Sequence, residues 1–364
     1  MGQYKTYLVM FLLSAAGAWV FTPLSIRLAR RWGAMDQPSQ RKIHREPTPR
    51  LGGLGVFPGF CLPWAGLYLL DNLVSATFQD FEGRFAALLF GALAMLCLGI
   101  YDDIKGADAA DKFAGQIGTA VILWWGGIRI EEVTNPWGEP IDLGWFGLPL
   151  SVLWLVGVTN AINLLDGIDG LVSGVTAVLA TALAVINVLN NNILVSLLTV
   201  SLAGACLGFL PYNRTPARTF LGDCGSLTLG MMLAGISVLS FFSEGRQKAS
   251  PVITVPLILF ALPVFDTARV MLLRIARGRS PFQADRNHVH HRLLAMGLNQ
   301  RQTAWTLYAV AAGTAAFAVL LFGMGKDSQL LGSAALAGLA AAAYAFWRLH
   351  LKDRVDADEE SPGG

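Results

Sequence analysis

The chain has 364 residues, of which 54% are hydrophobic and only 14% are charged, and its formal net charge is +2 at pH 7. Soluble domains carry about 25% charged residues, so this composition excludes an ordinary soluble protein and is typical of a chain that crosses a lipid bilayer many times. The four cysteines form no CxxC pair, and we expect free thiols. The net charge says little by itself, because the distribution of charge carries the information, and we expect no nucleic-acid partner.

Apolar segments of roughly 17 to 25 residues are long enough to span the hydrocarbon core of a bilayer. We predict about eleven of them, and the sixth and seventh are separated only by Asn190–Asn192. They cover residues 7–27, 52–70, 84–101, 114–130, 146–165, 171–190, 193–211, 226–243, 251–273, 303–323 and 329–348. The predicted fold is an all-α polytopic membrane protein, with a single transmembrane domain over 1–351 and a polar C-terminal tail over 352–364.

Lysine and arginine gather in the loops on one side of this arrangement. Because cytoplasmic loops of membrane proteins carry an excess of these residues, we expect the basic side to face the cytoplasm, with the N-terminus outside and the C-terminus inside. On the opposite side, the turn residues and acidic bias of 131–145 predict a small hairpin. The basic side also carries the polar motifs of the chain, in loops 28–51, 102–113, 160–170, 211–226 and 274–302.

The stretch NAINLLDGIDG ends a strongly apolar run and places Asn160, Asn163, Asp166 and Asp169 three residues apart. On a helix, adjacent members of such a series stay neighbours, and Gly167 loosens the backbone where the carboxylates emerge. Two amides and two carboxylates therefore converge where an apolar segment meets water. Polar groups beside a bilayer cost free energy, so we expect these to have a function. The arrangement favours the binding of a cation or of a hydrogen-bonding ligand.

Asp102 and Asp103 are adjacent at the end of the third apolar segment. Two neighbouring carboxylates repel each other, so a cation or a proton must relieve the pair. The plainer interpretation is ordinary charge at a helix end, with Lys105 and Lys112 as neutralising partners. The second acidic stretch, 160–170, lies on the same side and favours the functional interpretation.

Asp223 lies between Gly222 and Gly225, just before the eighth apolar segment. Glycines permit a tight turn and the close approach of a ligand, and a carboxylate there can bind Mg²⁺, which prefers oxygen ligands and retains several waters. As the N-cap of a helix, either Asp223 or Ser226 would be ordinary, so this motif alone is a weak signal.

Two basic loops carry histidine. The loop DQPSQRKIHREPTPRLGG includes Lys42 and His44, and it is either a binding surface for phosphate or lipid headgroups or a simple positive-inside stop signal. The ninth apolar segment contains Asp266 and Arg269, which are spaced to pair along a helix. After it, histidines stand among arginines, at His288, His290, His291 and Arg292. A zinc site lacks its usual spacing and a solvated basic loop is the plain alternative, but this composition favours contact with phosphate.

Carboxylates and amides at cytoplasmic boundaries, ringed by basic loops, describe a phosphoryl-transfer site that binds Mg²⁺, with Mn²⁺ as a substitute. From Asp36 to about Gly297, the chain resembles the polyprenyl-phosphate N-acetylhexosamine-1-phosphate transferases. The matching stretches, in the order of that family, are DQPSQRKIHREPTPRLGG, YDDIKGADAADKFAGQ, NAINLLDGIDGL, FLGDCGS and RSPFQADRNHVHHRL. The resemblance implies that a lipid phosphate attacks the β-phosphorus of a UDP-N-acetylhexosamine, which releases UMP and leaves a lipid diphosphate sugar.

The resemblance also implies a role for each matching residue. Asp223 corresponds to the principal metal ligand, with Asn163 as a second. Asp102 and Asp103 match a catalytic pair beside the lipid phosphate, which Asp102 either deprotonates or orients. Asp166, His290 and His291 are further catalytic candidates. The nucleotide pocket would be lined by Asn163, Asp166, Asp169 and Phe220, and the phosphate groups or the sugar would contact Lys42, His44, Lys105, Lys112, His288, His290, His291 and Arg292.

Within that family, RSPFQADRNHVHHRL and the Asp266–Arg269 stretch resemble the branch that transfers N-acetylglucosamine 1-phosphate, whereas the muramoyl-pentapeptide branch carries adjacent histidines there. The implied acceptor is undecaprenyl phosphate in a bacterial cytoplasmic (inner) membrane. An epimeric donor sugar and a homodimer both stay open. An ion-coupled transporter predicts acids near the bilayer midplane, but here the acids lie at the cytoplasmic ends. A non-catalytic lipid-binding relative could have lost these acids.

Overall fold

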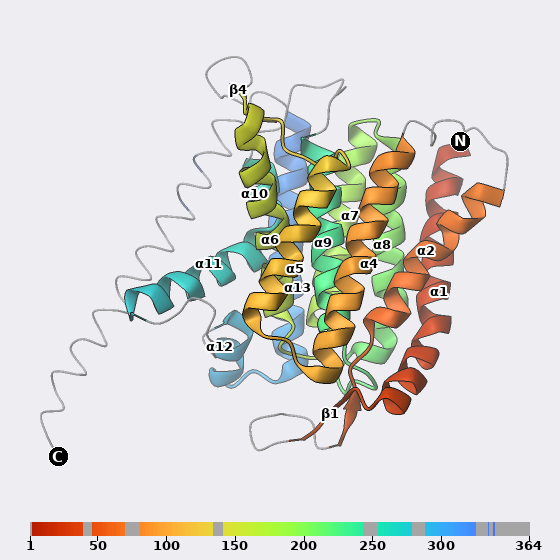
Figure 1. Ribbon diagram of the computed structural model, residues 1–364, viewed down its shortest axis with the longest axis vertical. Coiled ribbons are helices and arrows are strands. Elements are labelled where there is room, and N and C mark those ends of the chain that lie inside the picture. Colours follow the sequence, from red (N-terminus) through yellow and green to blue (C-terminus); the bar gives the residue numbers. More distant parts are fainter. Residues whose placement is uncertain are drawn as a thin grey trace, which may run out of the picture.

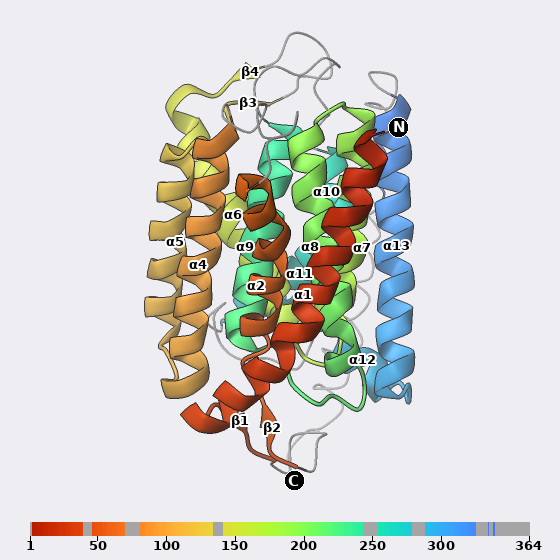
Figure 2. The ribbon, with the colours of Figure 1, turned by 90° about the vertical axis from the view of Figure 1, so that its right-hand side faces the viewer.

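The structure is a computed structural model, and it describes residues 2–38, 46–69, 81–133, 141–242, 254–278 and 288–324, with the single positions 334 and 338. It is a bundle of helices that mostly run side by side (Figure 1, Figure 2). In the described ranges, 7 helices are long and apolar enough to cross a membrane. The predicted all-α polytopic class is confirmed.

The helices follow the predicted apolar segments. In chain order they are α1 (Gly2–Trp32), α2 (Gly53–Leu69), α4 (Glu82–Lys105), α5 (Ala109–Trp125), α6 (Gly147–Leu165), α7 (Leu171–Leu189), α8 (Ile193–Asn213), α9 (Gly222–Phe241), α10 (Thr254–Leu259), α11 (Ala261–Ala276), α12 (Val289–Ala295) and α13 (Gln300–Met324). Two short antiparallel hairpins pair β1 (Met35–Asp36) with β2 (Thr48–Pro49) and β3 (Glu132–Val133) with β4 (Ile141–Asp142). The second is the hairpin predicted within 131–145.

The turn between α7 and α8 is as short as the sequence predicts. Asn191 takes φ 55°, in the left-handed region that asparagine tolerates better than most residues. Asn192 Oδ1 then accepts the backbone N–H of Val195 at 3.3 Å and caps α8. Three asparagines therefore suffice to reverse the chain between two long helices.

At the centre of the bundle lies α9. It packs against α4 and α6, and its most apolar 18-residue window is 100% buried. Around it, α1 packs against α2 and α8, while α13 packs against α7. Figure 2 places α4 and α5 at one edge of the bundle and α13 at the other. Asp223, in the first turn of α9, is thus carried by the most enclosed of the seven membrane-length helices in the described ranges.

The predicted ninth span, 251–273, is divided into two helices. α10 ends at Leu259, and Phe260 leaves helical geometry before α11 begins. Pro263 has no N–H to donate to the carbonyl of Leu259, so a continuous α-helix is blocked at this point. α11 turns away from the other helices (Figure 1). The eleventh predicted segment, 329–348, and the tail lie outside the described residues.

Candidate active site

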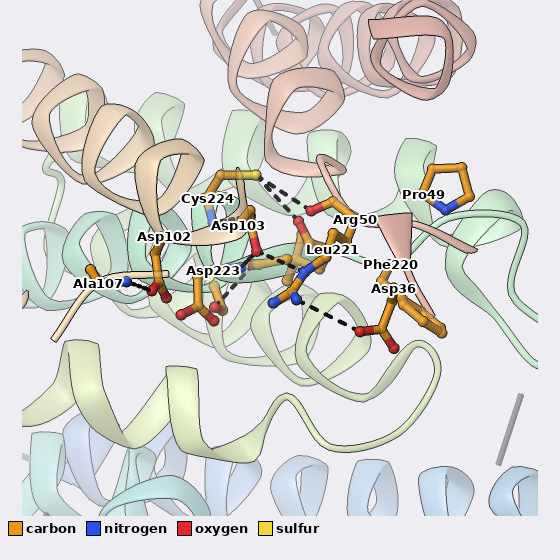
Figure 3. Close-up of polar contacts among 12 residues, drawn as sticks. Asp36, Pro49, Arg50, Asp102, Asp103, Ala107, Phe220, Leu221, Asp223 and Cys224 are labelled. Carbon is orange, nitrogen blue, oxygen red and sulfur yellow. Dashed lines mark hydrogen bonds and ion pairs between the residues drawn. The ribbon is translucent and has the colours of Figure 1, made fainter. Parts of the chain in front are cut away.

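Segments that are far apart in the sequence meet at one end of the bundle, where α4 ends and α9 begins. We call four carboxylates there the aspartate cluster: Asp102, Asp103, Asp166 and Asp223. Figure 3 shows Asp102, Asp103 and Asp223 close together, with Arg50 reaching towards them. The structure thus brings together the acidic motifs that the sequence placed on one side of the membrane.

Asp103 holds the start of α9. Its side chain is fully buried, and its two oxygens accept the backbone N–H groups of Asp223 at 3.1 Å and Cys224 at 3.0 Å. The N-cap residue of α9, Leu221, makes no side-chain cap, so Asp103 supplies from α4 the acceptor that these N–H groups need. Arg50 Nε donates to the same carboxylate at 3.0 Å. Asp103 therefore has partners on both oxygens and positions Asp223.

Close backbone contact allows this capping. A Cβ on Gly99 of α4 would lie 2.3 Å from Cys224 Cα, so only glycine lets α4 approach the start of α9. Gly222 has φ +74°, and a Cβ there would lie 1.9 Å from Arg50 O and 2.6 Å from Asp103 Oδ2. Both the backbone conformation and the lack of space therefore require glycine at position 222.

Lys112 of α5 lies between the other two helix-borne carboxylates. Its Nζ is 2.7 Å from Asp102 Oδ2 and 2.5 Å from Asp223 Oδ2. Asp102 also accepts the backbone N–H of Ala107 at 2.6 Å, in the turn after α4. Without the ammonium, two carboxylates would repel each other across a partly buried site. One positive charge shared by two carboxylates marks a position that a bound cation fits.

The donor set at this position suits a hard cation such as Mg²⁺, which binds carboxylates and keeps several waters. Asp102 and Asp223 offer the carboxylates. Asn163 lies beside them, since its Nδ2 donates to Asp223 Oδ1 at 3.0 Å and to Ser226 Oγ at 2.8 Å. Within the described ranges, no three His, Cys, Asp or Glu side chains are grouped as a metal-binding set. What these residues offer is two carboxylates and a neighbouring amide.

Asp166 directly follows α6 and begins the loop DGIDG. Burial raises the pKa of Asp166 to about 8, and the carboxylates of Asp223 and Asp103 add to this rise. Asp166 therefore carries a proton near neutral pH. A protonated carboxyl group can donate a hydrogen bond to an anion, which an ionised one cannot.

The rest of the loop is tied down on two sides. Asp169 Oδ2 accepts the backbone N–H of Ala217 at 3.0 Å, which joins the loop to the segment before α9. The hydroxyl of Tyr308, on α13, donates to Gly170 O at 2.6 Å. These contacts fix the backbone of 166–170 beside the aspartate cluster.

One histidine of the α12 segment, His290, contacts this loop, and another, His288, contacts Asp266. His288 Nδ1 lies 2.8 Å from Asp266 Oδ2, and both side chains are buried. His290 is 1% exposed and packs on Gly167, where an added Cβ would lie 2.0 Å from its Nε2. Burial lowers the pKa of His290 to about 3, and His291 and His288 add to the effect. The ring of His290 is therefore neutral at physiological pH.

A family model described as glycosyl transferase family 4 matches residues 85–241. A probable undecaprenyl-phosphate N-acetylglucosaminyl 1-phosphate transferase of Bacillus subtilis is 36% identical over 303 residues, which cover 83% of this chain and 81% of that protein. The chain belongs to glycosyl transferase family 4. The family resemblance predicted from the five motifs is confirmed.

Two other relatives carry the names of two different transferases. A decaprenyl-phosphate N-acetylglucosaminephosphotransferase of Mycobacterium tuberculosis is 34% identical over 355 residues, which cover 90% of this chain and 86% of that protein. A phospho-N-acetylmuramoyl-pentapeptide-transferase of Halalkalibacterium halodurans is 30% identical over 341 residues, which cover 87% of this chain and 98% of that protein. Both branches considered from the sequence are therefore represented among its relatives.

Four more of the predicted site residues lie in the described part of the chain: Lys105, Phe220, His291 and Arg292. Lys105 is exposed, with its Nζ 5.8 Å from the ring centroid of Tyr101. Phe220 is anchored by its backbone N–H, which donates to Pro49 O at 2.7 Å. The short helix α12 carries two more, His291 and Arg292. Two lie outside the described residues, Lys42 and His44.

Three residues that shape the site were not predicted from the sequence as site residues. Arg50 contacts Asp103, although the sequence showed it only as one of many basic residues in the first loop. Gln116 accepts from Asn160 Nδ2 at 2.5 Å, and its signal was a polar residue one helical turn after Lys112 in an apolar segment. Tyr308 carried no signal, because aromatic residues are common in membrane spans.

Proposed function

We propose that this chain transfers N-acetylglucosamine 1-phosphate from its UDP-sugar to undecaprenyl phosphate, releasing UMP and forming a lipid diphosphate sugar. The observation that carries the proposal is the lysine shared by Asp102 and Asp223, because it marks a cation position between carboxylates that come from different helices. Relatives that align with more than four fifths of the chain are named for this reaction or for its decaprenyl-phosphate counterpart.

The residues of the aspartate cluster have different roles in this proposal. Asp102 and Asp223, with Asn163 beside them, would hold Mg²⁺ or Mn²⁺, which supplies positive charge to the diphosphate when bound. Asp102 also orients or deprotonates the lipid phosphate. Lys112 is a point charge on a flexible stem, so it can move from the carboxylates to a phosphate oxygen. Asp103 acts indirectly, because both of its oxygens are engaged in holding α9 and Arg50.

The donor nucleotide binds beside the loop 166–170. Asp166 carries a proton near neutral pH and can donate a hydrogen bond to the donor. His290 is neutral, so one of its ring nitrogens can donate and the other can accept. The proposed donor side also includes Asp169, Phe220, His288, His291 and Arg292.

We place this site at the cytoplasmic face of the bacterial inner membrane, in a chain of eleven spans with its N-terminus outside and its C-terminus inside. The support is the charge of the end of the bundle where the cluster lies. The last turn of α1 carries Arg30 and Arg31, and Arg214 directly follows α8. An excess of arginine and lysine is typical of cytoplasmic ends of membrane helices.

The test is purified protein with Mg²⁺, undecaprenyl phosphate and UDP-N-acetylglucosamine, assayed for UMP. Asp223→Ala and Asp102→Ala should each lose turnover by about 100-fold or more, the scale of one lost electrostatic contact in a transition state. Asp142→Ala, on the exposed β4 strand, is the matched control and should turn over normally. Near-normal turnover in Asp223→Ala would refute the site. UMP release only from the muramoyl-pentapeptide nucleotide would assign the other branch.

A further inference from the structure

Asp266 is a buried acid to which the proposed reaction gives no role. It lies on α11, the helix that turns away from the bundle, and is 8% exposed. His288 Nδ1 lies 2.8 Å from its Oδ2, and the backbone N–H of Val289 donates to its Oδ1 at 2.9 Å. Both oxygens of Asp266 therefore engage the start of α12, although 22 positions separate Asp266 from His288.

The placement of α12 depends on this contact. The helix has only 7 residues, and a helix so short is not stable by itself. Its N-cap residue, His288, makes no side-chain cap, so the carboxylate of Asp266 supplies the acceptor for the first N–H. A negative charge at the N-terminus also complements the helix dipole. The position of α12 is thus set from α11.

From Asp266 the contact continues to the candidate site through two imidazole rings. The rings of His288 and His290 are stacked, with centroids 5.9 Å apart and 5° between their planes. His290 then packs on Gly167, the second residue of the loop that begins with Asp166. Among the described residues, neither ring nitrogen of His290 has a hydrogen-bond partner, although the residue is 1% exposed. Buried polar atoms are normally paired, so these nitrogens point to a ligand contact.

We propose that Asp266 is a positioning residue for the donor side of the site. It fixes His288, and through His288 it fixes the contact of His290 with the loop 166–170. Nδ1 of His288 carries the proton that faces the carboxylate, so the pair also sets the tautomer of His288. The identity of the donor, a UDP-sugar, rests on the proposed function. Removing Asp266 leaves the ammonium of Lys112 and its carboxylates in place and alters only the donor side.

Two variants of Asp266 are compared with a control at another buried polar residue. Asp266→Ala removes both acceptors, whereas Asp266→Asn keeps an acceptor for the N–H of Val289. The control is Asn187→Leu: Asn187 is fully buried and donates to Ser240 Oγ at 2.8 Å, near the end of α7 that lies away from the loop 166–170. Removing one partner of a buried pair destabilises a protein wherever the pair lies. A loss of stability therefore does not distinguish a positioning role of Asp266 from a purely structural one.

The decisive measurement is the KM for each substrate. In Asp266→Ala, KM for UDP-N-acetylglucosamine should rise about 10- to 100-fold, the scale of a misplacement near 1 Å, while KM for undecaprenyl phosphate stays unchanged. Asp266→Asn should show a smaller rise. Asn187→Leu should lower the melting temperature and leave both KM values unchanged. Wild-type KM values in Asp266→Ala, or equal rises for both substrates, would overturn the proposal.

Hydrogen exchange of the protein without substrates gives a readout that does not require turnover. The backbone amides of 289–295 should exchange faster in Asp266→Ala than in wild type, and they should be unaffected in Asn187→Leu. A wild-type protein that releases no UMP would refute the proposed function and leave this comparison intact. Unchanged exchange in α12 of Asp266→Ala would refute the positioning role even in an active enzyme.

Discussion

Gly167→Ala should push α12, which carries His290, away from the loop 166–170, because it adds one methyl group between them. Gly167 is not among the glycines with positive φ, so alanine fits the backbone and the effect is steric. The new Cβ would lie 2.0 Å from Nε2, 2.6 Å from Cε1 and 2.7 Å from Cδ2 of His290. Because three ring atoms clash at once, a small rotation of the imidazole does not relieve the contact.

The size of the effect follows from these distances. Ordinary van der Waals contact begins near 3.4 Å, so the ring must retreat by about 1.4 Å from its 2.0 Å contact. His290 is 1% exposed and stacked on His288, which leaves it little room. Overpacking of this kind costs about 1–3 kcal/mol of stability. A displacement near 1 Å at a site can reduce turnover about 100-fold, and we expect losses of both kinds.

UMP release and thermal unfolding measure the two losses. The matched control is Gly157→Ala on α6, where an added Cβ meets nothing within 4 Å, and it should leave turnover unchanged. His290→Ala tests the steric origin, because without the ring Gly167→Ala should cost little further stability. If Gly167→Ala costs the same stability with and without the imidazole, the reasoning is wrong. Wild-type turnover in Gly167→Ala would equally refute it.

Three further changes test the aspartate cluster. Lys112→Met removes the ammonium between Asp102 and Asp223, so Mg²⁺ should raise the melting temperature of this variant more than that of wild type, and equal shifts would contradict the cation position. The pKa of folded Asp166 is about 8 and that of an unfolded aspartate is about 3.9, so the folded state holds the extra proton between these values. Without Mg²⁺, stability in denaturant should therefore fall as pH rises from about 6.5 to 8 in wild type, and a similar fall in Asp166→Asn would refute this assignment. Below about pH 6.5, the lowered pKa of His290 acts in the opposite direction, because the unfolded histidine then binds the proton. Gly222→Ala forces an L-residue to φ +74° against Arg50 O and should cost about 2 kcal/mol or more, whereas Gly118→Ala, with open space around it, should cost far less in the same unfolding assay.

The helices and the turn between α7 and α8 could be predicted from the sequence because they depend on local patterns. Apolar length defines each span, and Asn190–Asn192 contains both the left-handed residue and the cap that the turn needs. The break between α10 and α11 also had a local signal in Pro263. The apolar run on both sides of that proline favoured one continuous span. The missing N–H of proline nevertheless divides the segment into two helices.

The partners of individual acids could not be predicted, because they come from segments distant in sequence. Asp266 has Arg269 at helical spacing, yet its carboxylate contacts His288. The adjacent Asp102 and Asp103 predict a pair of carboxylates that share a cation. In the structure, Asp103 instead caps a helix that begins about 120 positions later. Such contacts depend on how α4, α9 and α11 pack, and hydropathy and spacing within one segment carry no information about that packing.

The central position of α9 has a consequence for the membrane around the protein. Its most apolar 18-residue window is 100% buried, whereas the corresponding windows of α1 and α13 are only 33% and 28% buried. A thicker or thinner bilayer is accommodated by the tilt of outer helices that touch lipid. Asp223 is carried by a helix that the others shield, so changes in acyl-chain length should reach the reacting groups only weakly.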